Sequence, residues 1–286
     1  MFTFAALFLN RATQSGASIF SSVFLANVLA ALSFSAFWVF DGSLPEWHHF
    51  WQPLVIAFFY IGGQIGILAA VSLGDVSVAT PIASSKVIIV SMLLVVFGIE
   101  SPTLATWIAV LLATSGVVLI NFVVPATDHK RVFLTVALAL VGASSFASFD
   151  ICVQTWSPQW GTGRMVPVAY WMVGLLSLGL LPWIDSPKTL FVKKMAWKSL
   201  VIGSTLVAVQ AMFLVYAIAQ YGDAARINVV YSLRGLWGVL FAWLLASWFG
   251  GAEKNTATTI MLARLGGALL LVAAVAFTVL EVHRTQ

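Results

Sequence analysis

Two basic residues, Lys86 and Arg234, lie deep inside apolar stretches of this 286-residue chain, and their side chains suit the binding of an anion. A charge at the centre of a membrane helix costs about 2.5–3.5 kcal/mol on insertion scales, so such residues mark functional sites by default. A lysine and an arginine that face one cavity would bind a carboxylate or a phosphate, and arginine can hold it through two parallel hydrogen bonds. The other interpretation is that each side chain extends to the membrane interface or pairs with Asp150.

Asp150 lies in another apolar stretch, and three roles are open to it. It could take up a coupling ion, either H⁺ or Na⁺, it could bind an amine of the substrate, or it could be the counter-ion of Lys86 or Arg234. Electrostatics favours the counter-ion, because buried charges are stable only when they are paired. Arg264 lies near the loop end of the last apolar stretch, close in sequence to Glu253, where we expect a structural role or an extension of the side chain to the membrane interface.

Uncharged polar residues near these charges could bind a substrate through hydrogen bonds. The candidates are Gln64, Gln210, Tyr231, Asn228 and Ser85. Tyr231 precedes Arg234 by three residues, so the two side chains share a helix face. The alternative for the two glutamines is a hydrogen bond between helices, worth about 0.6 kcal/mol on average in a membrane.

The composition predicts an all-α integral membrane protein. The chain is 61% hydrophobic and 8% charged, whereas soluble domains are about 25% charged. Backbone groups in lipid must bond internally, so the apolar stretches are helices. Ten such stretches can be counted, at about 1–10, 17–40, 51–73, 77–97, 103–125, 131–156, 165–184, 197–220, 226–250 and 256–281. All but the first are long enough to cross a bilayer, which takes roughly 20 residues.

An internal duplication organises these stretches into two repeats, residues 1–126 and 131–282. The sequence WQPLVI at Trp51 returns as WKSLVI at Trp197, and a glutamine follows each tryptophan by thirteen residues. Lys86 and Arg234 each lie eleven residues after an aspartate that follows a glycine. Five helices in each repeat give the second repeat the opposite orientation in the membrane, an architecture of transporters. Aligning Phe8 with Phe149 predicts that the first helix begins about ten residues before Met1, so the chain as given lacks its start.

These residues resemble the drug/metabolite transporter superfamily, in its ten-helix EamA-like branch. Each half of an EamA-like protein ends in a fourth helix with a proline, a short Gly-Glu turn and a fifth helix with a central glycine run. The first half has Thr80-Pro81, Gly98-Ile-Glu100 and Gly116, and the second half has Gly251-Ala-Glu253 and Gly266-Gly267. The resemblance implies a central cavity lined by helices 1, 3, 4, 6, 8 and 9. It also implies that no cofactor is needed and that transport is driven by a gradient or by exchange.

The predicted function is therefore a secondary transporter of a small polar metabolite, anionic or zwitterionic, that works by alternating access. We expect a multi-pass protein of the cell (inner) membrane, as a monomer or homodimer, with the lipid bilayer, the substrate and a coupling ion as its partners. The alternative is a non-transporting membrane scaffold or assembly subunit. The positive charge of +4 is spread over short loops, so it indicates topology and no nucleic-acid partner.

Catalysis and metal binding are not expected. An enzyme acting on lipid would need paired carboxylates, or a histidine beside a nucleophile, at one place. The four histidines all fall outside the apolar stretches, and Cys152 is the single cysteine. No catalytic residue, metal site or cofactor is therefore predicted.

Overall fold

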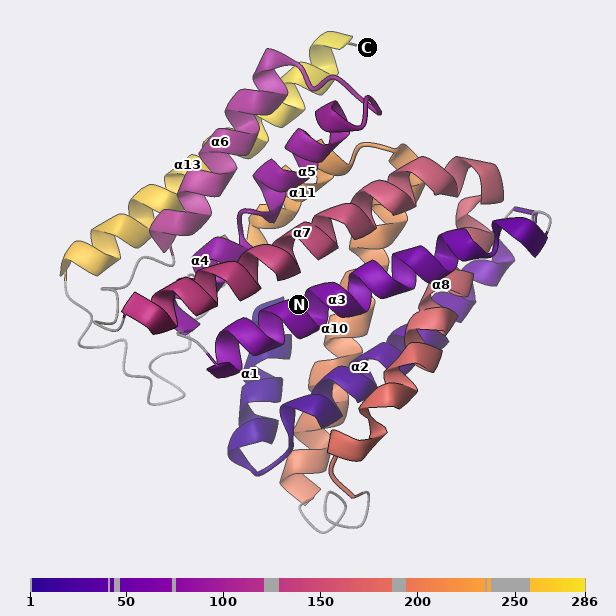
Figure 1. The fold of residues 1–286 in the computed structure, drawn as a ribbon. Helices are drawn as coiled ribbons and strands as arrows, with labels where there is room; N and C mark the ends of the chain where they lie inside the picture. Colours follow the sequence, from indigo (N-terminus) through magenta and orange to yellow (C-terminus); the bar gives the residue numbers. More distant parts are fainter. Residues whose placement is uncertain are drawn as a thin grey trace. The chain divides into compact units, whose positions relative to one another are not determined.

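The computed structural model describes residues 2–40, 42–43, 47–73, 76–120, 129–186, 194–234, 236–237 and 258–285. Every regular element in these ranges is a helix (Figure 1). The α-helices are α1 (Phe2–Gln14), α2 (Ile19–Phe34), α3 (Trp51–Leu73), α4 (Val76–Ala83), α5 (Lys86–Val96), α6 (Leu104–Ile120), α7 (His129–Trp160), α8 (Thr162–Leu176), α10 (Lys194–Tyr221), α11 (Ala224–Ser232) and α13 (Thr258–Thr285). The 3₁₀ helices are η1 (Ser35–Val39), η2 (Trp47–His49) and η3 (Ser177–Trp183).

Six helical segments of the described chain are long and apolar enough to cross a membrane. They are Ile19–Val39, Trp47–Leu73, Val132–Trp160, Thr162–Trp183, Ala196–Tyr221 and Ala263–Glu281. Two shorter apolar helices, Lys86–Val96 and Leu104–Ile120, accompany them. The predicted all-helical, multi-pass class is confirmed.

The fourth predicted span is not one continuous helix. It is divided into α4 and α5 at Ser84 and Ser85. The backbone N–H of Ser85 donates to the Ile82 carbonyl at 3.0 Å, and the Ser85 hydroxyl donates to the same carbonyl at 2.7 Å. A continuous helix would give that carbonyl to the N–H of Lys86. The competing serine donors therefore end α4, and Lys86 becomes the first residue of α5.

The helix around Arg234 is interrupted at the corresponding place. α11 ends at Ser232, whose hydroxyl donates to the Val229 carbonyl at 2.6 Å. The backbone N–H of Leu233 then donates to the Val230 carbonyl at 3.1 Å, which tightens the turn. Arg234 follows this turn, as Lys86 follows the turn at Ser85. Most of the rest of the predicted ninth span, residues 238–250, lies outside the described residues.

The chain forms two compact units, and each unit is built from two segments far apart in the sequence. Unit 1 consists of Met1–Ile61 and Cys152–Gly222, and unit 2 consists of Gly62–Ile151 and Asp223–Gln286. Each unit therefore takes one segment from each predicted repeat. The division into repeats 1–126 and 131–282 is a division of the sequence, and it stays a prediction.

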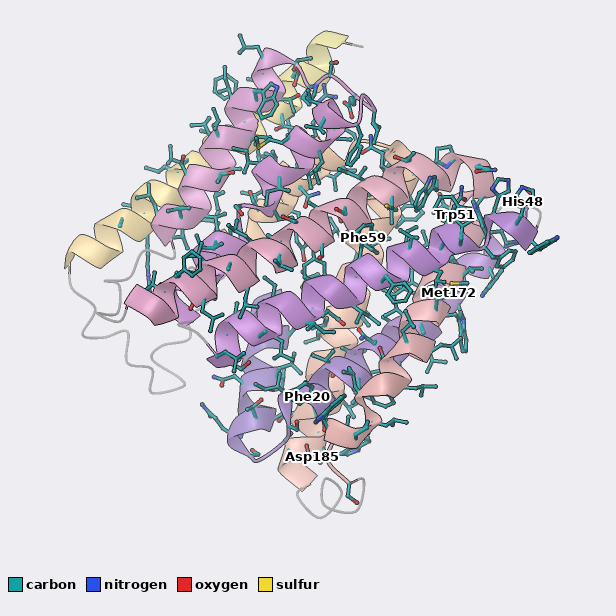
Figure 2. All side chains as sticks on the ribbon, in the orientation of Figure 1. Phe20, His48, Trp51, Phe59, Met172 and Asp185 are labelled. Atoms are coloured by element: carbon teal, nitrogen blue, oxygen red, sulfur yellow. The ribbon has the colours of Figure 1, made fainter. Side chains whose placement is uncertain are left out.

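Within unit 1, α2 packs on α8, and polar side chains close both ends of this pair. At one end, an Asp185 carboxylate oxygen accepts from the Ser18 N–H at 2.5 Å and from the Ser21 hydroxyl at 2.8 Å. This negative charge lies at the amino-terminal end of α2, where the helix dipole favours it. Figure 2 places Asp185 and Phe20 near this end of unit 1. At the other end, Arg164 donates to the carbonyl of Trp38 at 3.0 Å.

A buried amide also fixes the end of α7 in unit 1. The Gln52 side-chain oxygen accepts from the Trp160 indole N–H at 2.7 Å, and Trp160 is fully buried. Gln52 lies in the first turn of α3. His48 and Trp51 lie close together near that amino-terminal end of α3 (Figure 2). Trp47 and Trp51 are exposed, as expected for side chains at a membrane interface.

Unit 2 depends on glycines at two helix crossings. α6 and α13 lie side by side (Figure 1), and a Cβ built on Gly267 would meet the Gly116 carbonyl oxygen at 2.5 Å. A Cβ on Gly66 of α3 would meet the backbone of Gly142 of α7 at 2.7 Å. Small residues let membrane helices approach closely, so these crossings hold α3, α7, α6 and α13 together. α7 is the element that carries Asp150.

Candidate functional site

The centre of the candidate site in unit 2 is an ion pair between two helices. Lys86 of α5 lies with its Nζ atom 2.6 Å from Oδ2 of Asp150 on α7. The Asp150 side chain is 0% exposed and the Lys86 side chain is 16% exposed. The structure thus brings two of the predicted charges together, in the counter-ion arrangement that electrostatics favoured. The positive charge of Lys86 is compensated at this contact.

Asn228 of α11 completes the contact. Its side-chain nitrogen donates to the same Asp150 Oδ2 at 2.6 Å and to the Ala224 carbonyl at 2.8 Å. Asn228 is itself 1% exposed. Both N–H groups of the Asn228 side-chain nitrogen donate hydrogen bonds, so the orientation of this amide is fixed. Asn228 was predicted as a substrate ligand, and in this structure its amide holds Asp150.

The two oxygens of the Asp150 carboxylate differ sharply in their surroundings. Oδ2 accepts from both Lys86 and Asn228, whereas Oδ1 is buried and has no hydrogen-bond partner among the described residues. A buried polar atom left unsatisfied costs about 1–3 kcal/mol, and more when it carries charge. The Lys86 Nζ also lies 6.0 Å from the ring of Phe146, one helical turn before Asp150. The ion pair between Lys86 and Asp150 therefore lies close to an aromatic side chain.

Tyr231 and Arg234 form a second polar contact in unit 2. The Arg234 guanidinium donates to the Tyr231 hydroxyl at 2.7 Å, and its central carbon lies 4.3 Å from the centre of the tyrosine ring. The spacing of three residues predicted this contact. Tyr231 and Arg234 are both partly buried. The Tyr231 hydroxyl and ring thus both contribute to the orientation of the arginine.

The remaining candidates are distributed over both units. Gln64 lies on α3 in unit 2 and Gln210 on α10 in unit 1, and both are partly buried. Ser85 uses its hydroxyl on the Ile82 carbonyl, so its role in the structure is to end α4. Arg264 is partly buried on α13. Of the predicted residues, Lys86, Asp150 and Asn228 form one hydrogen-bonded group, and Tyr231 and Arg234 form another.

A charged network in unit 2 was not predicted from the sequence. Arg226 near the start of α11 donates to Asp223 at 3.0 Å and lies 3.5 Å from the Glu281 carboxylate on α13. Glu281 also accepts hydrogen bonds from Thr103 and Thr106, before and within the first turn of α6. The signal available in the sequence was Asp223, which caps α11 by accepting from the Arg226 N–H at 3.0 Å. The partner Glu281 lies too near a helix end to stand out.

The chemistry open to these groups is the binding and release of ions and polar solutes. Among the described residues, no group of three or more His, Cys, Asp or Glu side chains is placed to hold a metal ion. The Lys86 ammonium can bind an anion once it is released from Asp150, and Asp150 Oδ1 can accept a hydrogen bond. The single cysteine, Cys152, is partly buried.

The described helices and their buried polar groups define a multi-pass helical membrane protein. Residues 1–122 match the EamA-like transporter family, which confirms the resemblance predicted from the sequence. The match is consistent with a member of the drug/metabolite transporter superfamily, and the family implies a membrane transporter of that type. No curated protein sequence matches the chain.

A solved crystal structure shares the fold. It is similar over 100% of this chain and 96% of its own, with a TM-score of 0.68 and 16% sequence identity. At that identity the likeness shows the fold alone. The substrate of this chain must therefore be inferred from its own residues.

Proposed function

We propose that the protein is a secondary transporter that moves a small polar metabolite, anionic or zwitterionic, across the cell (inner) membrane by alternating access. The observation that carries the proposal is the buried Lys86–Asp150–Asn228 group, placed where α4 gives way to α5. A purely structural core would bury apolar side chains there, because a buried ion pair gains little or nothing over a well-packed apolar core. The EamA-like match over residues 1–122 supports the same function.

The interrupted helices support a substrate site near these residues. Secondary transporters bind substrates and ions where membrane helices are discontinuous, because freed backbone groups and half-helix ends face the site there. The interruptions before Lys86 and after Ser232 fall at corresponding positions of the two predicted repeats. Both place a basic residue immediately after the break. This correspondence supports the proposed ten-helix fold of two inverted five-helix repeats.

The helix pairs within each unit support the same repeat. α2 packs on α8 in unit 1, and α6 packs on α13 in unit 2. In the predicted numbering these are helices 2 with 7 and 5 with 10, which are repeat-related partners. Repeat-related helices contact each other where they lie next to a pseudo-twofold axis, so these two pairings are compatible with inverted repeats.

A screen followed by a transport assay tests the proposal. Purified protein is heated with pools of amino acids, organic acids and sugar phosphates, because a solute bound by the folded state raises the unfolding temperature by mass action. Each solute that does so is then tested for uptake into proteoliposomes. We expect Lys86→Ala and Arg234→Ala to abolish uptake and Lys198→Ala, which removes an exposed lysine of α10, to leave it intact.

Two outcomes contradict the proposal. Uptake at the wild-type rate in both Lys86→Ala and Arg234→Ala removes the anion site from this place. A protein that binds none of the solutes and transports none favours the alternative of a non-transporting scaffold. Correct insertion of each variant is checked by size-exclusion chromatography in detergent.

A further inference from the structure

One oxygen of the Asp150 carboxylate in the candidate site lacks a hydrogen-bond partner among the described residues. Asp150 Oδ1 is buried within unit 2 and unsatisfied among the described residues, although Oδ2 of the same carboxylate accepts two donors at 2.6 Å. A carboxylate oxygen in this situation gains most from a proton or from a donor that comes with a ligand. The surroundings decide between these ligands.

An anion cannot replace Asp150 on Lys86 while Asp150 is ionised. The exchange would leave the Asp150 carboxylate, whose side chain is 0% exposed, without its cation. Breaking a buried ion pair by removing one partner costs about 3–5 kcal/mol. The negative substrate would also face the unsatisfied charge of Asp150. The proposed anion site on Lys86 is therefore closed in the ionised form.

A proton on Oδ1 removes this obstacle. The neutral acid still accepts from Asn228 through Oδ2, so Asp150 remains held in place when Lys86 leaves. Its new O–H group becomes a donor, and it can point at the same anion that Lys86 binds. Protonation thus turns a group that repels the anion into one that binds it.

The proton fits this place better than a metal cation. The two neighbours of the carboxylate are nitrogen donors, Lys86 Nζ and Asn228 Nδ2, and both repel a cation. Alkali and alkaline-earth ions require several oxygen ligands.

Other charged groups on the elements around Asp150 are engaged elsewhere. On α11, Arg226 pairs with Asp223. Arg234, which follows the turn at the end of α11, donates to Tyr231. The α3 helix contributes no charged residue, and α5 contributes Lys86 alone.

We infer that Asp150 takes up one proton on Oδ1 for each anionic group that Lys86 binds, so that proton and anion enter the site together. The inference rests on the proposed function and gives its coupling ion. No covalent bond other than the O–H bond is formed. The charges balance, since Asp150 becomes neutral while the anion replaces it beside Lys86. Because the linkage is reciprocal, each ligand strengthens the binding of the other.

Release of Lys86 also has a mechanical consequence, because it is the first residue of α5. The ion pair ties the beginning of α5 to α7, immediately after the interruption at Ser84 and Ser85. Protonation of Asp150 breaks this ion pair. The α4–α5 junction is then stabilised by the hydrogen bonds from Ser85 to the Ile82 carbonyl. The coupling ion would thus loosen the helix break on which the site is built.

The test uses the wild-type protein in lipid nanodiscs, without any substrate. Infrared difference spectra are recorded between neutral and acidic pH for the wild type and for Asp150→Asn. We expect one carboxyl C=O band to appear on acidification in the wild type and to be lost in Asp150→Asn. The matched control is Asp185→Asn, which removes a carboxylate of unit 1 that accepts from Ser18 and Ser21 and should keep the Asp150 band.

A second measurement follows the helix junction at one fixed pH. Asp150→Asn imitates the protonated acid, so amide hydrogen exchange in the segment 82–92 should be faster than in the wild type. The increase is about tenfold for each 1.4 kcal/mol of ion-pair stabilisation that is lost. If Asp150→Asn does not fold, Asp150→Glu replaces it, and the expected result is then a shift of the acid-induced band.

Identical spectra in the wild type and in Asp150→Asn overturn the inference, and so does an unchanged band in Asp150→Glu. A lost band with unchanged amide exchange also overturns it, because Lys86 then stays bound. These measurements need no solute, so they can fail while uptake that depends on Lys86 still succeeds. In that case the proposal of a transporter holds, and an ion other than the proton is coupled to transport.

Discussion

Removing both members of the Lys86–Asp150 pair should be far less damaging to stability than removing one. At a separation of 2.6 Å and an effective dielectric constant of about 20, the attraction amounts to about 6 kcal/mol. The loss of hydration on burial is several kcal/mol for each ion, so the net stabilisation by the pair is small. Lys86→Met alone leaves the fully buried Asp150 without its cation, and we expect a loss of about 3–5 kcal/mol.

The double variant Lys86→Met with Asp150→Leu removes both charges. Asn228 then keeps its hydrogen bond to Ala224 and loses the one to Asp150. An unsatisfied donor costs about 1–3 kcal/mol, so the double variant should recover most of the loss without reaching the wild type. Uptake of any solute should be absent in both variants, because the site lacks the Lys86 cation in each.

The assay is reversible unfolding in mixed detergent micelles, with proteoliposome uptake measured on the same preparations. Lys198→Met is the matched control, because Lys198 is exposed on α10, and its effect should stay within about 0.5 kcal/mol. A double variant no more stable than Lys86→Met would refute the reasoning that an uncompensated charge dominates the loss. Wild-type uptake by the double variant would refute a role of the pair in transport.

Three further predictions concern stability alone, measured by the same unfolding assay. Gly267→Ala should lower the free energy of unfolding by at least about 1–3 kcal/mol, since its Cβ would meet backbone at 2.5 Å. The neighbouring Gly266→Ala, whose Cβ would have nothing within 4 Å, should be neutral or stabilising. Equal losses in the two variants would contradict the close crossing. Gln52→Leu should cost about 1–3 kcal/mol by leaving the buried Trp160 N–H unpaired, and a neutral result would mean that the N–H finds another acceptor. Gly222→Ala should cost about 1–2 kcal/mol because φ is +63° there, and wild-type stability would show that the turn relaxes.

The membrane class and the most important charged contact could be predicted from the sequence. The length of the apolar stretches fixes the helices, because lipid offers no other partner to the backbone. Lys86 and Asp150 are charges in a medium that penalises isolated ions, so their pairing follows from the same energetics. The contact between Tyr231 and Arg234 follows from helix geometry, since three residues bring side chains to one face.

The helix interruption could not be read from the apolar pattern. Residues 77–97 are apolar almost throughout, and such a stretch looks the same whether one helix or two helices carry it. The decisive interaction is local, because Ser85 donates twice to the Ile82 carbonyl. Adjacent serines directly before a lysine inside an apolar stretch are the signal that could have indicated it.

Partners across long sequence separations were beyond prediction for another reason. Asn228 could face a cavity or another helix, and its spacing from Arg234 gives no preference between them. Its contact with Asp150 depends on how α11 packs within unit 2. The contact of Arg226 with Glu281 depends likewise on the packing of α11 against α13.

The predicted duplication supplies two cations and only one carboxylate, and this asymmetry bears on coupling. Lys86 and Arg234 correspond to each other in the repeat, yet Lys86 meets a carboxylate and Arg234 meets a phenol. Aligning Phe8 with Phe149 makes Leu9 the counterpart of Asp150, and Leu9 packs against Gly203 of α10. The first repeat therefore has no acid to protonate at that position. A transporter that follows the inference above would carry one proton in each cycle on Asp150.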